Sequence, residues 1–344
     1  MGVCHESHRA SFEGWWYDVL TAIYPKTMTS AACPIPERIS LNYHLLHKAK
    51  VADDLRHIIV DLSRACKYIS YALQTTHAGL SGSKNDTSNA FGEEQLKLDV
   101  LADDLLRQYL CESSLTCCYI SEEQRDIVEL NPDAPYSVVF DPLDGSSLVD
   151  ANFSIGTIIG IFEGDKVIGS TPRDMVASLY VLYGPRTLLV YSTGDGVHEF
   201  ILNDVGEFIL LREFLGVGDD AKNFSAGNLR AVNDNAKYRE ALNHWLDDEM
   251  TLRYSGCMVA DLHHIFSKGQ GIFTNVGGSK YPEGKLRLIF ECGPFAYLIE
   301  QAGGKASDGT QSILDVKITE IDQRTPLIIG SSNEVDRTVK ALAV

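Results

Sequence analysis

Two aspartates spaced three residues apart, Asp141 and Asp144, are followed directly by three small residues, Gly145, Ser146 and Ser147. Carboxylate oxygens are the ligands that Mg²⁺ prefers in proteins. The backbone N–H groups of small residues in a turn can approach a bound phosphate closely. The segment therefore predicts a metal-dependent phosphate site, and the alternative is a turn with a structural role only.

The residues just before this segment predict the element that positions it. Residues 136–140 are rich in β-branched and aromatic side chains, which indicates a buried strand. Asp141 would then lie at the carboxyl end of that strand. Because Pro142 has no N–H to donate, we expect the ladder to stop there.

Acidic residues in three further segments could join this pair of aspartates. Glu122 and Glu123 are adjacent, so in a strand the pleat would send one side chain to a metal and the other to a water molecule. Glu93 and Asp99 lie at the start of an expected helix, where carboxylates also suit the helix dipole. Glu291 ends an apolar run that indicates a strand, where an unpaired buried acid would be costly. The first two segments also have a structural interpretation, as a solvated surface and as a helix cap respectively.

Length and charge limit the class of partner. The chain has 344 residues, enough for one large domain or two closely joined halves. Its net charge of −17 argues against nucleic acid, and the absence of 18 consecutive apolar residues argues against a membrane span. The eight cysteines include no CxxC pair and the N-terminus has no apolar signal segment. We therefore expect reduced thiols and a cytoplasmic protein.

Helices and strands are expected throughout the chain after an N-terminal extension over residues 1–36. Apolar spacing predicts helices over 52–73, 93–110, 294–301 and part of 224–254, with another beginning at Pro172. Strands are predicted over 155–162, 187–192, 198–203, 207–211 and 285–291, and a loop over 78–88. This mixture indicates a layered α/β or α+β architecture.

The order of these motifs resembles the fructose-1,6-bisphosphatase / sedoheptulose-1,7-bisphosphatase family over roughly residues 40–340. The resemblance rests on the blocks 92–101, 121–123, 140–147, 155–158, 253–254, 258–261, 284–287, 291 and 302–304. It implies a layered α-β-α-β-α fold in one compact unit. A subdomain over 37–205 would carry the metal site, and one over 206–344 would carry the sugar and distal-phosphate site. It also implies a homodimer or homotetramer.

The resemblance further implies a role for each matching residue. Two or three Mg²⁺ or Mn²⁺ ions would be held by Glu93, Glu122, Asp141, Asp144, Glu291 and the carbonyl of Leu143. The attacking water would be handled by Asp99, Glu123 and Glu93. The 1-phosphate would be bound by Asp144, Gly145, Ser146 and Ser147, and the sugar and distal phosphate by Asn228, Arg230, Arg253, Tyr254, Met258, Lys285 and Arg287. Paired cations can clamp the entering and leaving oxygens of such a displacement, and basic side chains match a distal phosphate.

Two departures from the family pattern bear on these roles. The family usually has an aspartate where this chain has Glu93, which leaves open how that residue serves the metal or the water. Residues 224–231 resemble the Ser-Pro-Gly-Asn-Leu-Arg segment of sedoheptulose-bisphosphatases, whereas fructose-bisphosphatases carry Asn-Glu-Gly-Tyr there. Arg230 could bind phosphate bidentately, and its small neighbours leave room for a longer sugar. The alternative is neutral drift in a surface loop.

These observations predict Mg²⁺-dependent hydrolysis of sedoheptulose 1,7-bisphosphate to sedoheptulose 7-phosphate and phosphate. The substrate could instead be fructose 1,6-bisphosphate, or both sugars. A related inositol- or nucleotide-phosphate phosphatase is a second interpretation, against which Arg253, Tyr254 and the 285–287 block argue. A catalytically silent sugar-phosphate-binding scaffold is a third, against which the retained carboxylates argue.

Overall fold

The computed structural model describes residues 38–75, 84–88 and 94–343. The chain divides into two compact units, Met1–Arg38 and Ile39–Val344, and everything below concerns the second. The predicted N-terminal extension and Glu93 lie outside the described residues.

An eight-stranded sheet carries the segment with the two aspartates. Its strands lie in the order β10-β9-β8-β7-β6-β5-β3-β4, and all described neighbours are antiparallel except β3 and β5. The strands are β3 (Thr116–Ser121), β4 (Val128–Glu129), β5 (Tyr136–Asp144), β6 (Ile155–Glu163), β7 (Met175–Tyr183), β8 (Thr187–Ser192), β9 (His198–Leu202) and β10 (Phe208–Arg212). A separate ribbon pairs β1 (Lys84–Ser88) with β2 (Glu94–Leu96).

A second sheet of five strands follows in the chain. Its order is β12-β11-β13-β15-β14, with β11 parallel to both of its neighbours and the remaining pairs antiparallel. The strands are β11 (Asn223–Gly227), β12 (Thr251–Leu252), β13 (Ile272–Asn275), β14 (Lys305–Ser307) and β15 (Leu327–Gly330).

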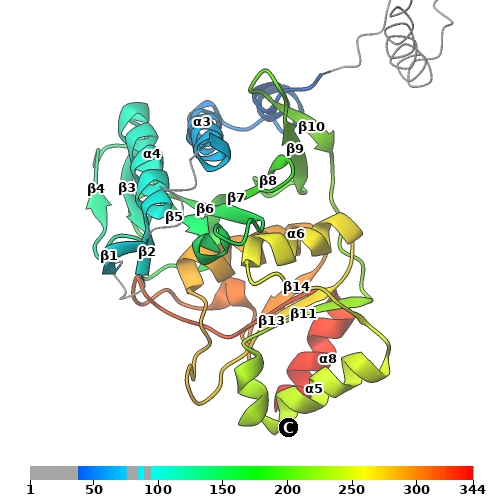
Figure 1. Cartoon of the computed structure of the whole chain (residues 1–344). Coiled ribbons are helices and arrows are strands. Elements are labelled where there is room, and N and C mark those ends of the chain that lie inside the picture. The colour runs from blue at the N-terminus through cyan, green and yellow to red at the C-terminus, as the bar shows by residue number, and fades with distance from the viewer. Residues whose placement is uncertain (1–37, 76–83, 89–93, 344) are drawn as a thin grey trace, which may run out of the picture. The chain divides into compact units, whose positions relative to one another are not determined.

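Three pairs of helices cover the sheet faces. The helices are α3 (Asp53–Thr75) with α4 (Lys97–Ser113), α6 (Met258–Lys268) with α7 (Gly293–Gln301), and α5 (Ala236–Asp247) with α8 (Ser332–Ala343). Side chains alternate between the faces of β5, so Val138 and Phe140 pack with α3 and α4, whereas Val139 packs with α6 and α7. The α6–α7 layer also contacts the second sheet, whose other face packs on α5 and α8. Figure 1 shows this α-β-α-β-α order, which confirms the predicted fold class.

Most long elements confirm the expectations from apolar spacing. The helix predicted over 52–73 is α3, and its predicted inward residues, such as Ile58, Leu62 and Cys66, are buried. The strands predicted over 155–162, 187–192, 198–203 and 207–211 are β6, β8, β9 and β10, and the helix over 294–301 is α7. The helix expected within 224–254 is α5. The cysteines among the described residues are free thiols.

Two element types were predicted wrongly. The helix expected from Pro172 is a short 3₁₀ turn, Pro172–Asp174, followed by strand β7. Nearly every residue of β7 is buried, and a strand buried on both faces is continuously apolar, so its spacing also fits a helix. The strand expected over 285–291 is instead a π-helical turn, Leu288–Cys292, that leads into α7. Short apolar runs of this kind do not distinguish strand from helix.

Three predicted boundaries are also corrected. The second helix begins at Lys97, because Glu94–Leu96 forms β2, and the last five residues of the predicted loop over 78–88 form β1. The ladder does not stop at Pro142: β5 continues to Asp144, which pairs with Gly156 after an irregularity that follows Asp141. A bulge tolerates a proline because the bulged residues leave the regular hydrogen-bond pattern.

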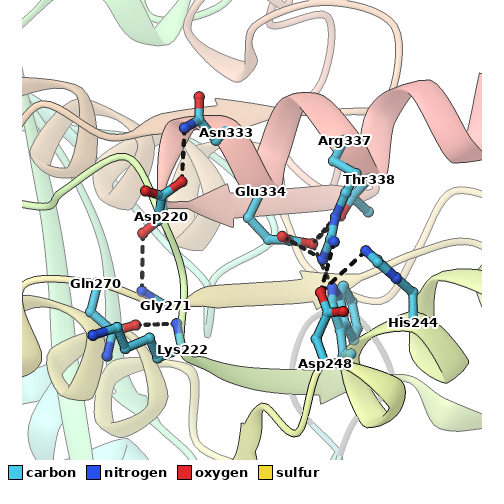
Figure 2. A network of polar contacts seen from close by, with 12 residues as sticks. Asp220, Lys222, His244, Asp248, Gln270, Gly271, Asn333, Glu334, Arg337 and Thr338 are labelled. Carbon is cyan, nitrogen blue, oxygen red and sulfur yellow. Dashed lines mark hydrogen bonds and ion pairs between the residues drawn. The ribbon is translucent and has the colours of Figure 1, made fainter.

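A polar network holds the C-terminal helix α8 against α5 (Figure 2). The carboxylate of Glu334 accepts a hydrogen bond from Trp245 Nε1 at 2.6 Å and one from Arg337 Nε at 3.1 Å. Arg337 also donates to Asp248 at the end of α5, at 3.0 Å. Because Glu334 is buried, these donors compensate for its lost hydration.

Candidate active site

A cavity of about 410 Å³ collects most of the residues that the sequence singled out. Its walls come from the end of β5 and the turn after it, from the start of α4, from the residues that follow β3, and from the segment before α7. The lining residues are Asp99, Glu122, Glu123, Asp141, Leu143, Asp144, Gly145, Ser146, Ser147, Gly256, Lys285, Leu286, Arg287 and Glu291.

The bulge at the end of β5 positions both aspartates. Asp141 Oδ1 accepts a hydrogen bond from the backbone N–H of Leu143 at 2.9 Å. The hydroxyl of Thr157 on β6 donates to the carbonyl of Pro142 at 2.9 Å and so ties the bulge to the neighbouring strand. Gly145 follows with φ +82°, a left-handed conformation that favours glycine, and a 3₁₀ turn begins at Ser146.

Three carboxylates converge at the end of β5 and in the turn before α7. One oxygen atom each of Asp141, Asp144 and Glu291 lies within 4.8 Å of the others. Burial, and then the neighbouring carboxylates including Glu122, raise the pKa values of Asp141 and Glu291 well above their ordinary range. Desolvation raises the pKa of Asp144 to about 6 despite two hydrogen bonds that favour its ionised form.

This donor set fits a divalent cation. All three ligand groups are hard oxygens, and their mutual repulsion in a desolvated site disfavours the charged state unless a cation is present. The carboxylates would hold such an ion, and Leu143, whose carbonyl is a predicted ligand, lines the same cavity.

Glu122 forms an ion pair with the buried guanidinium of Arg287. Arg287 is 2% exposed; its Nη1 forms an ion pair with Glu122 and its Nε donates to Asp322 at 2.7 Å. Its backbone N–H donates to Glu291 Oε2 at 2.6 Å. The segment before α7 thus contacts two of the predicted metal ligands.

The residues predicted to handle water line the same cavity. Asp99 is buried in the first turn of α4, and Glu123 is half-buried after β3. The backbone N–H of Glu123 donates to the Ser121 hydroxyl at 3.2 Å, which fixes the local turn. The structure therefore brings both acids to the cavity that holds the carboxylate cluster, while their catalytic roles stay predictions.

The turn after Asp144 offers donors to an anion. Among the residues that the structure describes, none accepts a hydrogen bond from the backbone N–H of Ser146 or Ser147. Both residues line the cavity. Backbone N–H groups beside a carboxylate cluster can bind some oxygens of a phosphate while a metal ion binds the others.

The predicted sugar-binding residues are only partly gathered at the cavity. Lys285 lines it, and its backbone N–H donates to Asn275 Oδ1 at 3.3 Å at the carboxyl end of β13. Asn275 is paired with Gly227 on β11, so Asn228 and Arg230 follow at the same end of the second sheet. Asn228 Nδ2 donates to the carbonyl of Val276 at 2.7 Å.

The other predicted substrate residues do not line this cavity. Arg230, Arg253 and Tyr254 are exposed, and Met258 is buried at the start of α6. Arg253 Nη1 donates to the carbonyl of Leu252 at 2.9 Å.

Sequence reasoning missed a contact from α6. Asp144 Oδ2 accepts hydrogen bonds from the thiol of Cys257 at 3.1 Å and from the backbone N–H of Val259 at 2.8 Å. Cys257 lies between two blocks of the resemblance, but no spacing or composition signal marked it.

Both the sequence and the fold match known proteins. The family described as fructose-1-6-bisphosphatase, N-terminal domain, matches residues 38–213, and the corresponding C-terminal domain matches residues 217–343. A class 1 fructose-1,6-bisphosphatase of Geobacter sulfurreducens is 43% identical over 302 residues, which are 87% of this chain and 94% of that protein. The chloroplastic sedoheptulose-1,7-bisphosphatase of Spinacia oleracea is 42% identical over 301 residues, which are 86% of this chain and 76% of that protein.

Two crystal structures share the fold. A putative sedoheptulose-1,7-bisphosphatase from Toxoplasma gondii superposes with a TM-score of 0.82 at 36% identity, covering 88% of this chain and 98% of that one. A fructose-1,6-bisphosphatase from Leishmania major superposes with a TM-score of 0.83 at 31% identity, covering 89% and 99%. Within the described residues, no helix is both long and apolar enough to span a membrane.

Proposed function

The chain belongs to the fructose-1,6-bisphosphatase family, and we propose that it removes the 1-phosphate of sedoheptulose 1,7-bisphosphate in a Mg²⁺-dependent hydrolysis. It is a sugar-bisphosphate phosphatase; the choice of sugar, the metal and the residue roles belong to the proposal. Assembly as a homodimer or homotetramer stays a prediction of the resemblance.

One observation carries the proposal. A single cavity holds a carboxylate cluster, two free backbone N–H groups and Lys285. A phosphate monoester needs cations to enter an acidic site, donors for its oxygens and positive charge for a second phosphate. The carboxylate cluster, the two backbone N–H groups and Lys285 lie in one cavity and can meet these three requirements.

In the proposed in-line displacement, separate groups of residues would hold the cations, the attacking water and the phosphate. When bound to the carboxylate cluster, divalent cations supply positive charge to the entering and leaving oxygens and lower the pKa of a coordinated water. Asp99 and Glu123 would orient the attacking water and accept its proton, because both acids line the cavity that holds the carboxylate cluster. Ser146 and Ser147 hold the phosphate through their backbone N–H groups. Glu93 is assigned beside the water from the resemblance alone.

The choice of sugar rests on residues 224–231. Asn228 adopts φ +48°, and the short helix Leu229–Asn233 that follows presents Arg230 to solvent at the end of β11. An exposed guanidinium next to an open turn can reach a distal phosphate farther from the metals than a tyrosine hydroxyl could. This chain is almost equally identical to the fructose-bisphosphatase (43%) and to the sedoheptulose-bisphosphatase (42%) compared above. Overall identity therefore favours neither sugar, and the proposed substrate depends on residues 224–231. Fructose 1,6-bisphosphate remains the alternative substrate.

The first test is phosphate release from a panel of sugar and inositol phosphates, with and without Mg²⁺. We expect the highest kcat/KM for sedoheptulose 1,7-bisphosphate, a lower value for fructose 1,6-bisphosphate, and no turnover after chelation. Preference for an inositol phosphate, or binding of sugar phosphates without turnover, would contradict the proposal.

Replacing Arg230 with Tyr tests the distal-phosphate assignment. Binding energy from a remote phosphate holds the reacting phosphate in place, so its loss should raise KM. We expect KM for sedoheptulose 1,7-bisphosphate to rise about tenfold, about 1.4 kcal/mol, with a smaller rise for fructose 1,6-bisphosphate. Steady-state kinetics on both sugars measures this, with Arg64→Tyr on α3 as an exposed-arginine control. Equal losses on both sugars would mean that Arg230 does not select chain length, and no loss would remove it from the site.

A further inference from the structure

Two groups at the start of α6 form hydrogen bonds with one oxygen of Asp144. The backbone N–H of Val259 donates to Oδ2 at 2.8 Å, and the thiol of Cys257 lies 3.1 Å from Oδ2 and 3.6 Å from the carbonyl oxygen of Asp144. The nearer oxygen, Oδ2, is the better acceptor for the thiol proton. Two donors occupy the two lone pairs of that oxygen. Oδ1 therefore remains as the oxygen with which Asp144 can ligate a cation.

The same side chain supports the phosphate-binding turn. A Cβ atom on Gly145 would lie 2.9 Å from Cys257 Cβ and 3.2 Å from its Sγ, so the thiol packs directly against the glycine. Cys257 is fully buried. One side chain thus touches both the carboxylate cluster and the turn that faces the phosphate.

Hydrogen bonds and packing hold the element behind Cys257. The N–H of Cys257 donates to the Ser255 hydroxyl at 3.2 Å, and the N–H of Ser255 donates to Asp261 Oδ1 at 2.7 Å. Helix α6 itself is buried between the two sheets through Val259 and Leu262. A donor fixed on a buried helix can hold a ligand in one orientation.

We propose that Cys257 is a positioning residue that orients Asp144 for metal binding and keeps the adjoining turn in place. The inference rests on the proposed metal-dependent function. The carboxylate must present the same oxygen to the ion in each turnover, and its hydrogen-bond partners determine which oxygen that is.

The test measures metal binding without turnover. Mn²⁺ is titrated into the metal-free protein and followed by electron paramagnetic resonance, for the wild type, Cys257→Ser and Cys257→Ala. Because serine retains a donor, we expect its Mn²⁺ dissociation constant to stay within about threefold of wild type; alanine should weaken binding about tenfold or more. Cys118→Ala is the control, since that buried thiol contacts the Ser137 hydroxyl at 3.1 Å and no predicted ligand.

A double-mutant cycle separates positioning from general packing. If Cys257 acts through Asp144, Cys257→Ala should have no further effect on Mn²⁺ binding in an Asp144→Asn background. A purely structural role would instead weaken binding and lower the melting temperature by the same amount in both backgrounds. The inference is overturned by additive effects, by wild-type Mn²⁺ affinity in Cys257→Ala, or by equal losses in the serine and alanine variants. Absence of Mn²⁺ binding in the wild type would overturn the metal-dependent function itself.

Discussion

Asp144→Asn is expected to lower kcat/KM for the sugar bisphosphate about 10³-fold, which corresponds to about 4 kcal/mol of transition-state stabilisation. Asp144 Oδ2 already accepts two hydrogen bonds. An amide must therefore turn its NH₂ group either toward the cation or toward the donors of Cys257 and Val259. The first orientation removes a hard oxygen ligand, and the second leaves the cation a neutral amide oxygen while it breaks both hydrogen bonds; the side-chain volume is nearly constant in either case. Steady-state kinetics over a Mg²⁺ titration measures the loss.

The metal-free protein should not be destabilised by this change. Asp144 lies among Asp141 and Glu291, and the loss of one negative charge reduces their mutual repulsion. Thermal unfolding in the presence of a chelator checks the melting temperature. Glu199→Gln is the matched control: Glu199 is a buried carboxylate on β9 that pairs with Arg212 at 2.6 Å and lies outside the cavity lining. It should retain wild-type kcat/KM and Mg²⁺ dependence. Wild-type turnover of Asp144→Asn at limiting Mg²⁺ would mean that the metal site is assigned wrongly.

Gly145→Ala is expected to lower kcat/KM about 100-fold. Its φ of +82° lies in the left-handed region, where a side chain adds about 1 kcal/mol or more of strain. Its Cβ would also meet Cys257 Cβ at 2.9 Å, so the turn has to move. A shift of the N–H groups of Ser146 and Ser147 by a fraction of an ångström misplaces the phosphate relative to the metals. Kinetics at saturating Mg²⁺ measures the effect.

A second glycine separates backbone strain from the steric clash. Gly206, in the turn between β9 and β10, has φ +79°, and no atom lies within 4 Å of the position that a Cβ would take there. Gly206→Ala therefore introduces similar strain without a contact, and it should lower the melting temperature slightly while kcat/KM stays at the wild-type value. Equal kinetic effects of the two substitutions would show that the Gly145 turn has no special role in the reaction.

The sequence was most informative where a pattern is local. The i, i+3, i+4 spacing predicted α3, because one helical face packs on the large sheet. The spacing of Asp141 and Asp144 with three small residues after them predicted a metal-dependent phosphate site, because carboxylates suit a divalent cation and small residues expose backbone N–H groups to an anion. Local spacing was misleading at β7, where burial on both faces removed the alternation that identifies a strand.

Distances between remote segments were decided by the tertiary structure. Glu291 lies far along the chain from Asp141 and Asp144, yet the π-helical turn before α7 brings its carboxylate within 4.8 Å of theirs. The contact of Cys257 with Asp144 likewise depends on α6 packing between the two sheets. Periodicity within a segment records which face is buried and does not record which distant segment buries it. The sequence by itself therefore determined the family and most of the long amphipathic elements, and it predicted the types of metal ligand. Only the packing of the layers decided which oxygen of Asp144 accepts hydrogen bonds from the start of α6.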